Sequence, residues 1–122
     1  MPVIKVKVPV PTNWSDWDAR DKVNSLVKEH MSSNNIPIPI PKVSEIKVQI
    51  RFGKKGPRDV DDAGKPIIDA LCPQISGIRG SQQKSRVVIL AGDTYDHVPR
   101  MIFEVYGGDD IQPLEAWLHI SY

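Results

Sequence analysis

The sequence predicts an α/β (α+β) fold, a mixed β-sheet packed with two main helices in the order β-α-β-α-β-β. Two segments alternate apolar with charged residues, as half-buried strands do. Two others carry apolar residues at helical spacing. At 122 residues the chain has the usual length of one domain, so residues 1–122 are expected to form a single domain.

The first strand and helix are predicted near the N-terminus. Apolar residues alternate with lysines from Ile4 to Val8, and prolines end this strand. Ser15 with Asp18 three positions later resembles a capping box. The spacing of the following apolar residues predicts a helix from about residue 15 to 32. The run Ile36–Pro41 alternates isoleucine with proline and must be extended, either as a connector over the core or as a docking strip.

The middle of the chain predicts a second strand and a second helix. Residues 45–52 show the clearest alternation of apolar and charged residues, and a glycine-containing loop follows. The second helix should begin near Asp61 and end before Pro73. Pro66 is tolerated if it lies in or just beyond the first turn, where backbone amides lack an intrahelical acceptor.

The C-terminal part predicts further β-structure. Val87–Leu90 and Met101–Tyr106 read as two strands, joined as a hairpin through the turn-rich segment Gly92–Pro99. Leu114–Ile120 is expected to add either an edge strand or a short helix.

Composition narrows the class of protein. The net charge is only +1, so phosphate binding would require local clustering of basic residues. The single cysteine, Cys72, excludes an internal disulfide and fits a reducing compartment. No signal peptide or membrane-spanning apolar run is present, so we expect a cytoplasmic protein with no membrane partner.

Charges are segregated between Arg51 and Asp69. Four basic residues come first, namely Arg51, Lys54, Lys55 and Arg58, and three acidic residues follow, namely Asp59, Asp61 and Asp62. Three carboxylates so close together repel one another unless a cation or the helix dipole offsets the repulsion. A positively charged ligand is therefore expected there.

Mg²⁺ meets this need, because it binds one or two carboxylates and keeps positions open for water and phosphate oxygens. Asp59 and Asp61 are the best candidate ligands, since one residue separates them at the entrance to the helix. Lys65 lies one helical turn after Asp61 and one before Asp69, so the three share a face. Lys65 could stabilise charge on the phosphate, while Asp69 orients the lysine side chain.

The basic residues before the acidic cluster would bind DNA phosphates. Lys84 and Arg86 extend that surface, or are exposed charges at a strand end. A simpler alternative covers the whole segment: the aspartates cap a helix, Asp61 and Lys65 form an ordinary ion pair, and the basic loop is solvated.

The string R-D-V-D-D-x-x-K-x-x-x-D-A-L, from Arg58 to Leu71, resembles the R-D-x-D-N-x-x-K-x-x-x-D-A-L signature of the RusA family of Holliday-junction resolvases. The segment P-x-P-T-N, from Pro9 to Asn13, is similar to that family's P-x-P-S-x-N segment. The resemblance implies a homodimer that binds four-way DNA junctions and nicks opposed strands with Mg²⁺ or Mn²⁺ in recombination and repair. It also implies metal-ligand roles for Asp59 and Asp61 and a catalytic role for Lys65.

The chain departs from this family in two places. Family members usually carry another acidic pair after the second helix, whereas Gly77–Lys84 contains no acid. Asp62 stands where asparagine is usual, and Asp62, Asp93 or Asp96 could supply the missing ligand. The alternative function is a RusA-like DNA-binding or regulatory protein with weakened cleavage.

The remaining aromatic and histidine residues add two expectations. Trp14 and Trp17 flank the start of the first helix, where a hydrophobic staple or core packing is expected rather than stacking on a base. The histidines share no ligand spacing, which argues against a zinc site.

Overall fold

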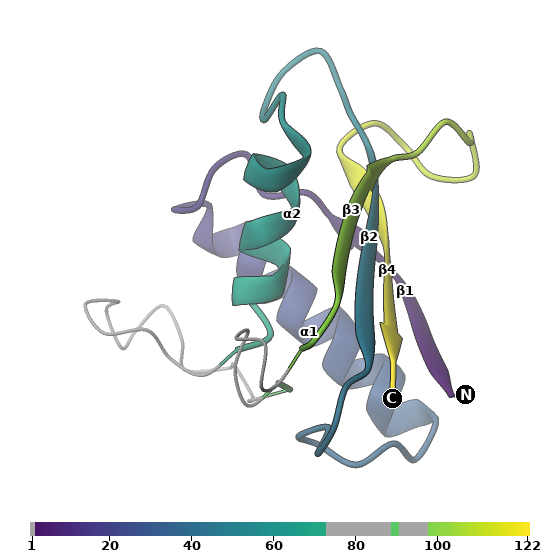
Figure 1. Ribbon diagram of the computed structural model, residues 1–122. Coiled ribbons are helices and arrows are strands. Elements are labelled where there is room, and N and C mark those ends of the chain that lie inside the picture. The colour runs from purple at the N-terminus through teal and green to yellow at the C-terminus, as the bar shows by residue number, and fades with distance from the viewer. Residues whose placement is uncertain (1, 73–88, 91–97) are drawn as a thin grey trace.

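The computed structural model describes residues 2–72, 89–90 and 98–122 (Figure 1). Its elements, in chain order, are β1 (Val3–Pro9), α1 (Trp17–Ser33), β2 (Glu45–Arg51), α2 (Val60–Asp69), β3 (Met101–Val105) and β4 (Glu115–Ser121). The predicted α+β class is confirmed, and the order of elements matches in outline. Neither helix in these ranges is long and apolar enough to cross a membrane.

The four strands form one mixed sheet in the order β1-β4-β2-β3. β4 runs antiparallel to both β1 and β2, and Leu118 lies opposite Val6 on one side and Val48 on the other. Of the two expectations for the segment after residue 114, the strand is confirmed, but its predicted place at the edge is wrong, because β4 is a central strand. Its alternate residues Ala116, Leu118 and Ile120 are fully buried, as one covered face requires.

The predicted strand Met101–Tyr106 is confirmed as β3, which pairs in parallel with β2. A parallel pair needs a crossover such as α2 rather than a tight turn. The other strand of the expected hairpin, Val87–Leu90, is described only at its last two residues. Ile89 and Leu90 are buried but not in a strand, since both of their amides donate to the carbonyl of Leu71, at 3.0 and 2.8 Å. The other half of that predicted strand, Val87–Val88, lies outside the described residues, as does most of the predicted turn.

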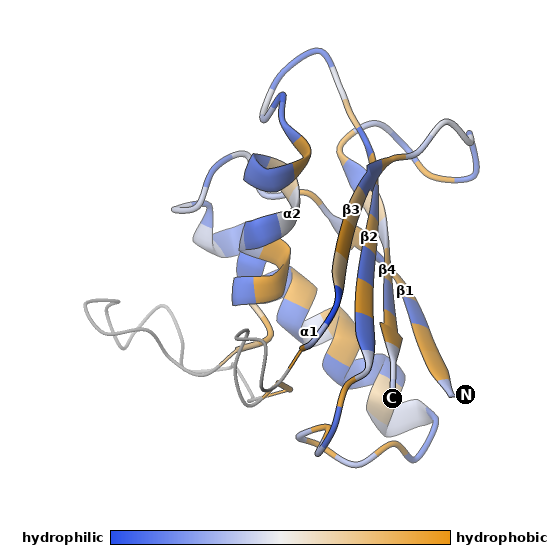
Figure 2. Cartoon of the chain, in the orientation of Figure 1, coloured by the Kyte–Doolittle hydropathy of each residue, from blue (hydrophilic) through white to orange (hydrophobic). Residues whose placement is uncertain are grey.

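Both helices lie on the same side of the sheet, and their apolar surfaces face it (Figures 1 and 2). The predicted alternation is confirmed, because Ile4, Val6 and Val8 in β1 and Ile46, Val48 and Ile50 in β2 are buried, whereas the charged residues between them are not. The core between helices and sheet includes Ile4, Val8, Val23, Val27, Met31, Ile46, Ile50, Ile67, Ile68 and Leu118.

The start of α1 differs from the predicted capping box. The N-cap is Asp16 rather than Ser15, and one of its carboxylate oxygens accepts a hydrogen bond from the amide of Ala19 at 3.3 Å. The side chain of Ser15 instead donates to Asn13 Oδ1, at 2.7 Å. Asp and Ser both make good caps, so the sequence pattern could not choose between neighbouring positions.

The predicted start of α2 near Asp61 is confirmed to within one residue. The helix begins at Val60, and Pro66 lies in its second turn, where the backbone position already has an intrahelical acceptor. Without an N–H group, Pro66 cannot donate to the carbonyl of Asp62. The helix nevertheless continues to Asp69, because Pro66, Ile67 and Ile68 are all buried in the core beside the sheet.

Candidate functional site

A pocket of about 360 Å³ is lined by residues of α2 and of the loop that joins β1 to α1. Figure 1 shows where these two segments lie in the fold. The loop contributes residues 12–14, and α2 contributes two acids of its first turn together with residues further along the same helix. The lining residues are Thr12, Asn13, Trp14, Pro57, Asp61, Asp62, Lys65, Pro66 and Asp69. Two segments far apart in the sequence thus form one concave site.

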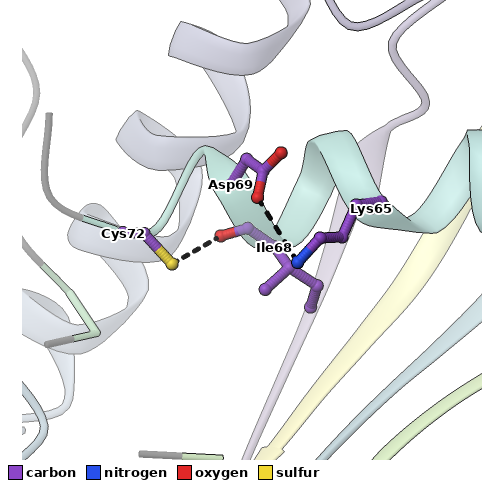
Figure 3. Close-up of polar contacts among 4 residues, drawn as sticks. All are labelled: Lys65, Ile68, Asp69 and Cys72. Carbon is purple, nitrogen blue, oxygen red and sulfur yellow. Dashed lines mark hydrogen bonds and ion pairs between the residues drawn. The ribbon is translucent and has the colours of Figure 1, made fainter. Parts of the chain in front are cut away.

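Lys65 and Asp69 form an ion pair on the exposed side of α2, with 3.7 Å between Nζ and Oδ1 (Figure 3). Asp61, Lys65 and Asp69 are spaced four residues apart, and all three line the pocket, as their predicted common face requires. The Lys65 side chain is 48% exposed, so this pair contributes little to the stability of the fold. The ion pair holds the lysine ammonium near Asp69.

The three clustered aspartates occupy different places at the start of α2. Asp59 is the N-cap residue, with extended backbone (φ −104°, ψ 147°), yet its side chain makes no capping hydrogen bond. Asp61 and Asp62 lie in the first turn and line the pocket, whereas Asp59 is not among the lining residues. The capping explanation therefore does not account for Asp59, although the helix dipole favours acids in the first turn.

No three acidic, histidine or cysteine side chains within residues 2–72, 89–90 and 98–122 are grouped closely enough to hold a metal ion together. Asp59, Asp61 and Asp62 therefore do not form a three-carboxylate site. Two carboxylates still suit Mg²⁺, which commonly takes one or two from a protein and completes its shell with water and phosphate oxygens. The other predicted candidates, Asp93 and Asp96, lie outside the described residues.

The predicted DNA-binding residues divide into three groups. Lys54, Lys55 and Arg58 are exposed on the loop that leads into α2. Arg51 is half-buried at the end of β2, and its Nη1 donates to the carbonyl of Ile111, which gives its guanidinium a structural contact. The remaining pair, Lys84 and Arg86, lies outside the described residues.

Hydrogen bonds fix the β1–α1 loop. The Asp16 carboxylate accepts from both the amide and the hydroxyl of Thr12, at 2.9 and 3.0 Å. Asn13 Oδ1 accepts from the amide of Ser15 at 2.9 Å. Hydrogen bonding to the Thr12 amide, above all, holds the pKa of Asp16 below its ordinary value of 3.8. The pocket wall formed by this loop is therefore well ordered by its own side chains.

Two buried polar residues of α1 hold the site together, and the sequence patterns do not single them out. Arg20 is only 1% exposed, and its Nη1 donates to the carbonyl of Trp14 at 2.6 Å. Asn24 is equally buried and donates to the carbonyl of Ala70, at the end of α2, at 2.9 Å. Polar residues in an amphipathic helix are usually exposed, so periodicity gives no sign of these contacts.

Leu114 links the two segments that form the pocket. Its amide donates to the carbonyl of Arg51 at 2.7 Å, and its carbonyl accepts from the amide of Val10 at 2.9 Å. A side chain added at Gly53 would meet Leu114 Cγ at 3.0 Å. Leu114 adopts a φ of 63°, which is unusual for a non-glycine residue. One residue before β4 thus joins the ends of β1 and β2, from which both parts of the site continue.

Trp14 does not pack in the core, and this corrects the expectation from sequence. Its side chain is 66% exposed, although it lines the pocket beside Asp61. Trp17 is partly buried and meets Trp14 edge to face, with ring centroids 5.8 Å apart. The exposed indole is thus a feature of the site rather than of the fold.

No protein-family model and no curated protein matches the chain.

Proposed function

We propose that this chain is a structure-selective endodeoxyribonuclease, dependent on Mg²⁺ or Mn²⁺, that nicks four-way DNA junctions in recombination and repair, as RusA-type resolvases do. One observation carries the proposal. The segments Pro9–Asn13 and Arg58–Leu71, which resemble that family separately in the sequence, both contribute residues to one pocket. A helix entrance that served only for capping would not require the distant segment.

The pocket residues fit the roles that such a reaction needs. Asp61, with Asp62 or Asp59, would hold the metal ion, which when bound polarises the phosphodiester and lowers the pKa of a water molecule. Lys65 stabilises negative charge on the phosphate or the leaving oxygen. Asp69 positions Lys65 through their ion pair.

Substrate binding would use the loop before α2. Its three exposed basic residues, Lys54, Lys55 and Arg58, can neutralise backbone phosphates next to the pocket. Two opposed strands of a four-way junction need two such sites, so the proposed form is a homodimer. With a DNA substrate and one cysteine, the proposed location is the cytoplasm.

A second candidate is a RusA-like protein that binds branched DNA with weakened cleavage. This candidate is favoured by the small number of acidic side chains at the site, because the described residues contain no group of three possible metal ligands. The sequence GIRGSQQK, from Gly77 to Lys84, supplies no acid either. The two candidates share a DNA-binding surface and differ only in whether the phosphodiester bond is cleaved.

Asp61→Asn tests the choice between them. A labelled four-way junction is incubated with the protein and Mn²⁺ or Mg²⁺, and both nicking and binding are measured. The nuclease proposal expects nicking by the unchanged protein and its loss in Asp61→Asn, by at least about 100-fold, because an amide is a poor ligand for a hard cation. Binding should stay equal or increase, since one repulsion with phosphate is removed.

Asp109→Asn is the matched control, because Asp109 is an exposed aspartate that does not line the pocket. It should nick as the unchanged protein does. Junction binding without nicking in every variant would favour the second candidate. Failure to bind branched or linear DNA at low salt would refute both.

A further inference from the structure

Trp14 is the aromatic residue that lines the pocket, and packing of the fold does not explain its exposed position. Large apolar side chains are usually covered, yet this indole is 66% exposed. A hydrophobic staple is excluded, because the residue directly before the N-cap Asp16 is Ser15 rather than Trp14. An exposed indole on the wall of a pocket is suited to contact with a ligand.

The backbone that carries Trp14 is held in place. Its carbonyl accepts the 2.6 Å hydrogen bond from buried Arg20. On either side of it, the amide of Thr12 donates to Asp16 and the amide of Ser15 donates to Asn13. The guanidinium of Arg20 also lies over the ring of Trp17, 4.5 Å from its centroid. A contact on a pre-ordered loop loses little conformational entropy when a ligand binds.

The geometry of the aromatic pair leaves the indole accessible. Trp14 and Trp17 meet at an interplanar angle of 85°, so Trp17 covers at most one face of Trp14. A flat ring with an accessible face binds another flat ring well, and every nucleobase offers one. Lys65, together with a metal ion held by the acids that line the same pocket, would suit the phosphate of the same strand.

We propose that Trp14 stacks on an unpaired nucleobase beside the phosphate that lies in the pocket, and that it thereby selects DNA with an unpaired or easily unstacked base. The inference rests on the proposed function for the placement of the phosphate. A base inside a continuous duplex is already stacked on both sides and must be extruded first. Extrusion costs least at a bulge, mismatch or branch point.

The test measures binding without cleavage, in EDTA at low salt, by fluorescence anisotropy. Three labelled DNAs are compared: a linear duplex, the same duplex with one unpaired thymine, and a four-way junction. The variants are Trp14→Ala and Trp14→Phe, with Trp117→Phe as the matched control. Trp117 lies on β4, outside the pocket, and its Nε1 donates to Asp110.

Trp14→Ala should weaken binding of the bulged duplex and the junction by roughly 5- to 150-fold, the range typical of one base stacked on an aromatic residue. Binding of the linear duplex should change by less than about twofold. Trp14→Phe should keep most of the affinity, and Trp117→Phe all of it. Quenching of tryptophan emission by the bulged DNA should persist in Trp117→Phe and disappear in Trp14→Phe. Since Trp14 is exposed, thermal unfolding of its variants should be unchanged.

Unchanged binding of all three DNAs by Trp14→Ala would overturn the inference, as would an equal loss for duplex and bulge, because either result separates the indole from an unpaired base. These results leave the nuclease proposal standing if Asp61→Asn still abolishes nicking. Conversely, selective loss of bulge binding together with an absence of nicking in all variants would support the role of Trp14 and refute the nuclease proposal.

Discussion

The packing of α2 on the sheet depends on the absence of a side chain at Gly64. A Cβ there would lie 2.5 Å from Cδ1, 2.8 Å from Cε1 and 3.0 Å from Cγ of Phe103 in β3. Ordinary carbon contacts are about 3.5–4.0 Å, so the helix and the ring would have to separate by about 1 Å. Gly64→Ala therefore perturbs the element that carries Asp61 and Lys65.

The expected loss follows from two opposing effects. Alanine is favoured over glycine inside a helix by about 1 kcal/mol. Overpacking of this severity costs up to about 3 kcal/mol, which leaves a net loss of about 1–2 kcal/mol in the free energy of unfolding. Urea denaturation with linear extrapolation measures this loss, and the midpoint temperature of thermal unfolding should fall by about 5 °C. Displacement of α2 should also reduce the nicking activity proposed above.

Two controls connect the loss to this contact. Gly107→Ala adds the same methyl group where no atom lies within 4 Å, so its effect should be neutral or stabilising by up to about 1 kcal/mol. In a Phe103→Leu background the smaller side chain gives way, and Gly64→Ala should become neutral or stabilising. An equal loss from Gly64→Ala in both backgrounds would show that Phe103 is not the cause.

Two further predictions concern titrating groups. Asp16→Ala should cost about 0.5–2 kcal/mol through loss of the cap and of the bonds from Thr12. Because the folded-state pKa of Asp16 is lowered, this stabilisation is present above pH 3.8 and is lost as the pH falls through the lower folded value. Urea unfolding at several pH values should therefore show that the stabilities of the variant and the parent protein converge in acid. A stability difference that stays constant with pH would contradict this role of Asp16. Burial, followed by the charges of Lys47 and Lys5, lowers the pKa of His119 below 6.5. As the pH falls, the histidine is therefore protonated in the unfolded chain before it is protonated in the folded one, so the free energy of unfolding should decrease below pH 6.5. An NMR titration of His119 checks this directly, and a midpoint at or above 6.5 would refute it.

Local periodicity accounts for what could be predicted of the fold. Alternation in residues 3–9 and 45–51 and helical spacing in residues 17–33 identified these elements within a few positions. Their patterns are local, because buried residues recur every two positions in a half-buried strand and every three to four positions in a half-buried helix. The face shared by Asp61, Lys65 and Asp69 was predicted for the same reason.

Errors arose where the outcome depended on distant partners. The burial pattern of Glu115–Ser121 is the same whether one or two strands pair with it, so its central place was not visible in the sequence. The parallel pairing of β3 with β2 was missed because consecutive strands were expected to form a hairpin.

The sequence by itself determined the α+β class, the alternating strands and the charged segment at the entrance to α2, since each depends on residues close together in the chain. Only the tertiary structure decided that Thr12, Asn13 and Trp14 face that segment across a pocket. That meeting depends on hydrogen bonds between distant residues, from Asn24 to Ala70 and between Leu114 and both Val10 and Arg51, and on the nearer bond from Arg20 to Trp14. Such contacts leave no periodic trace, because each is made once and by residues whose separation along the chain follows no repeat.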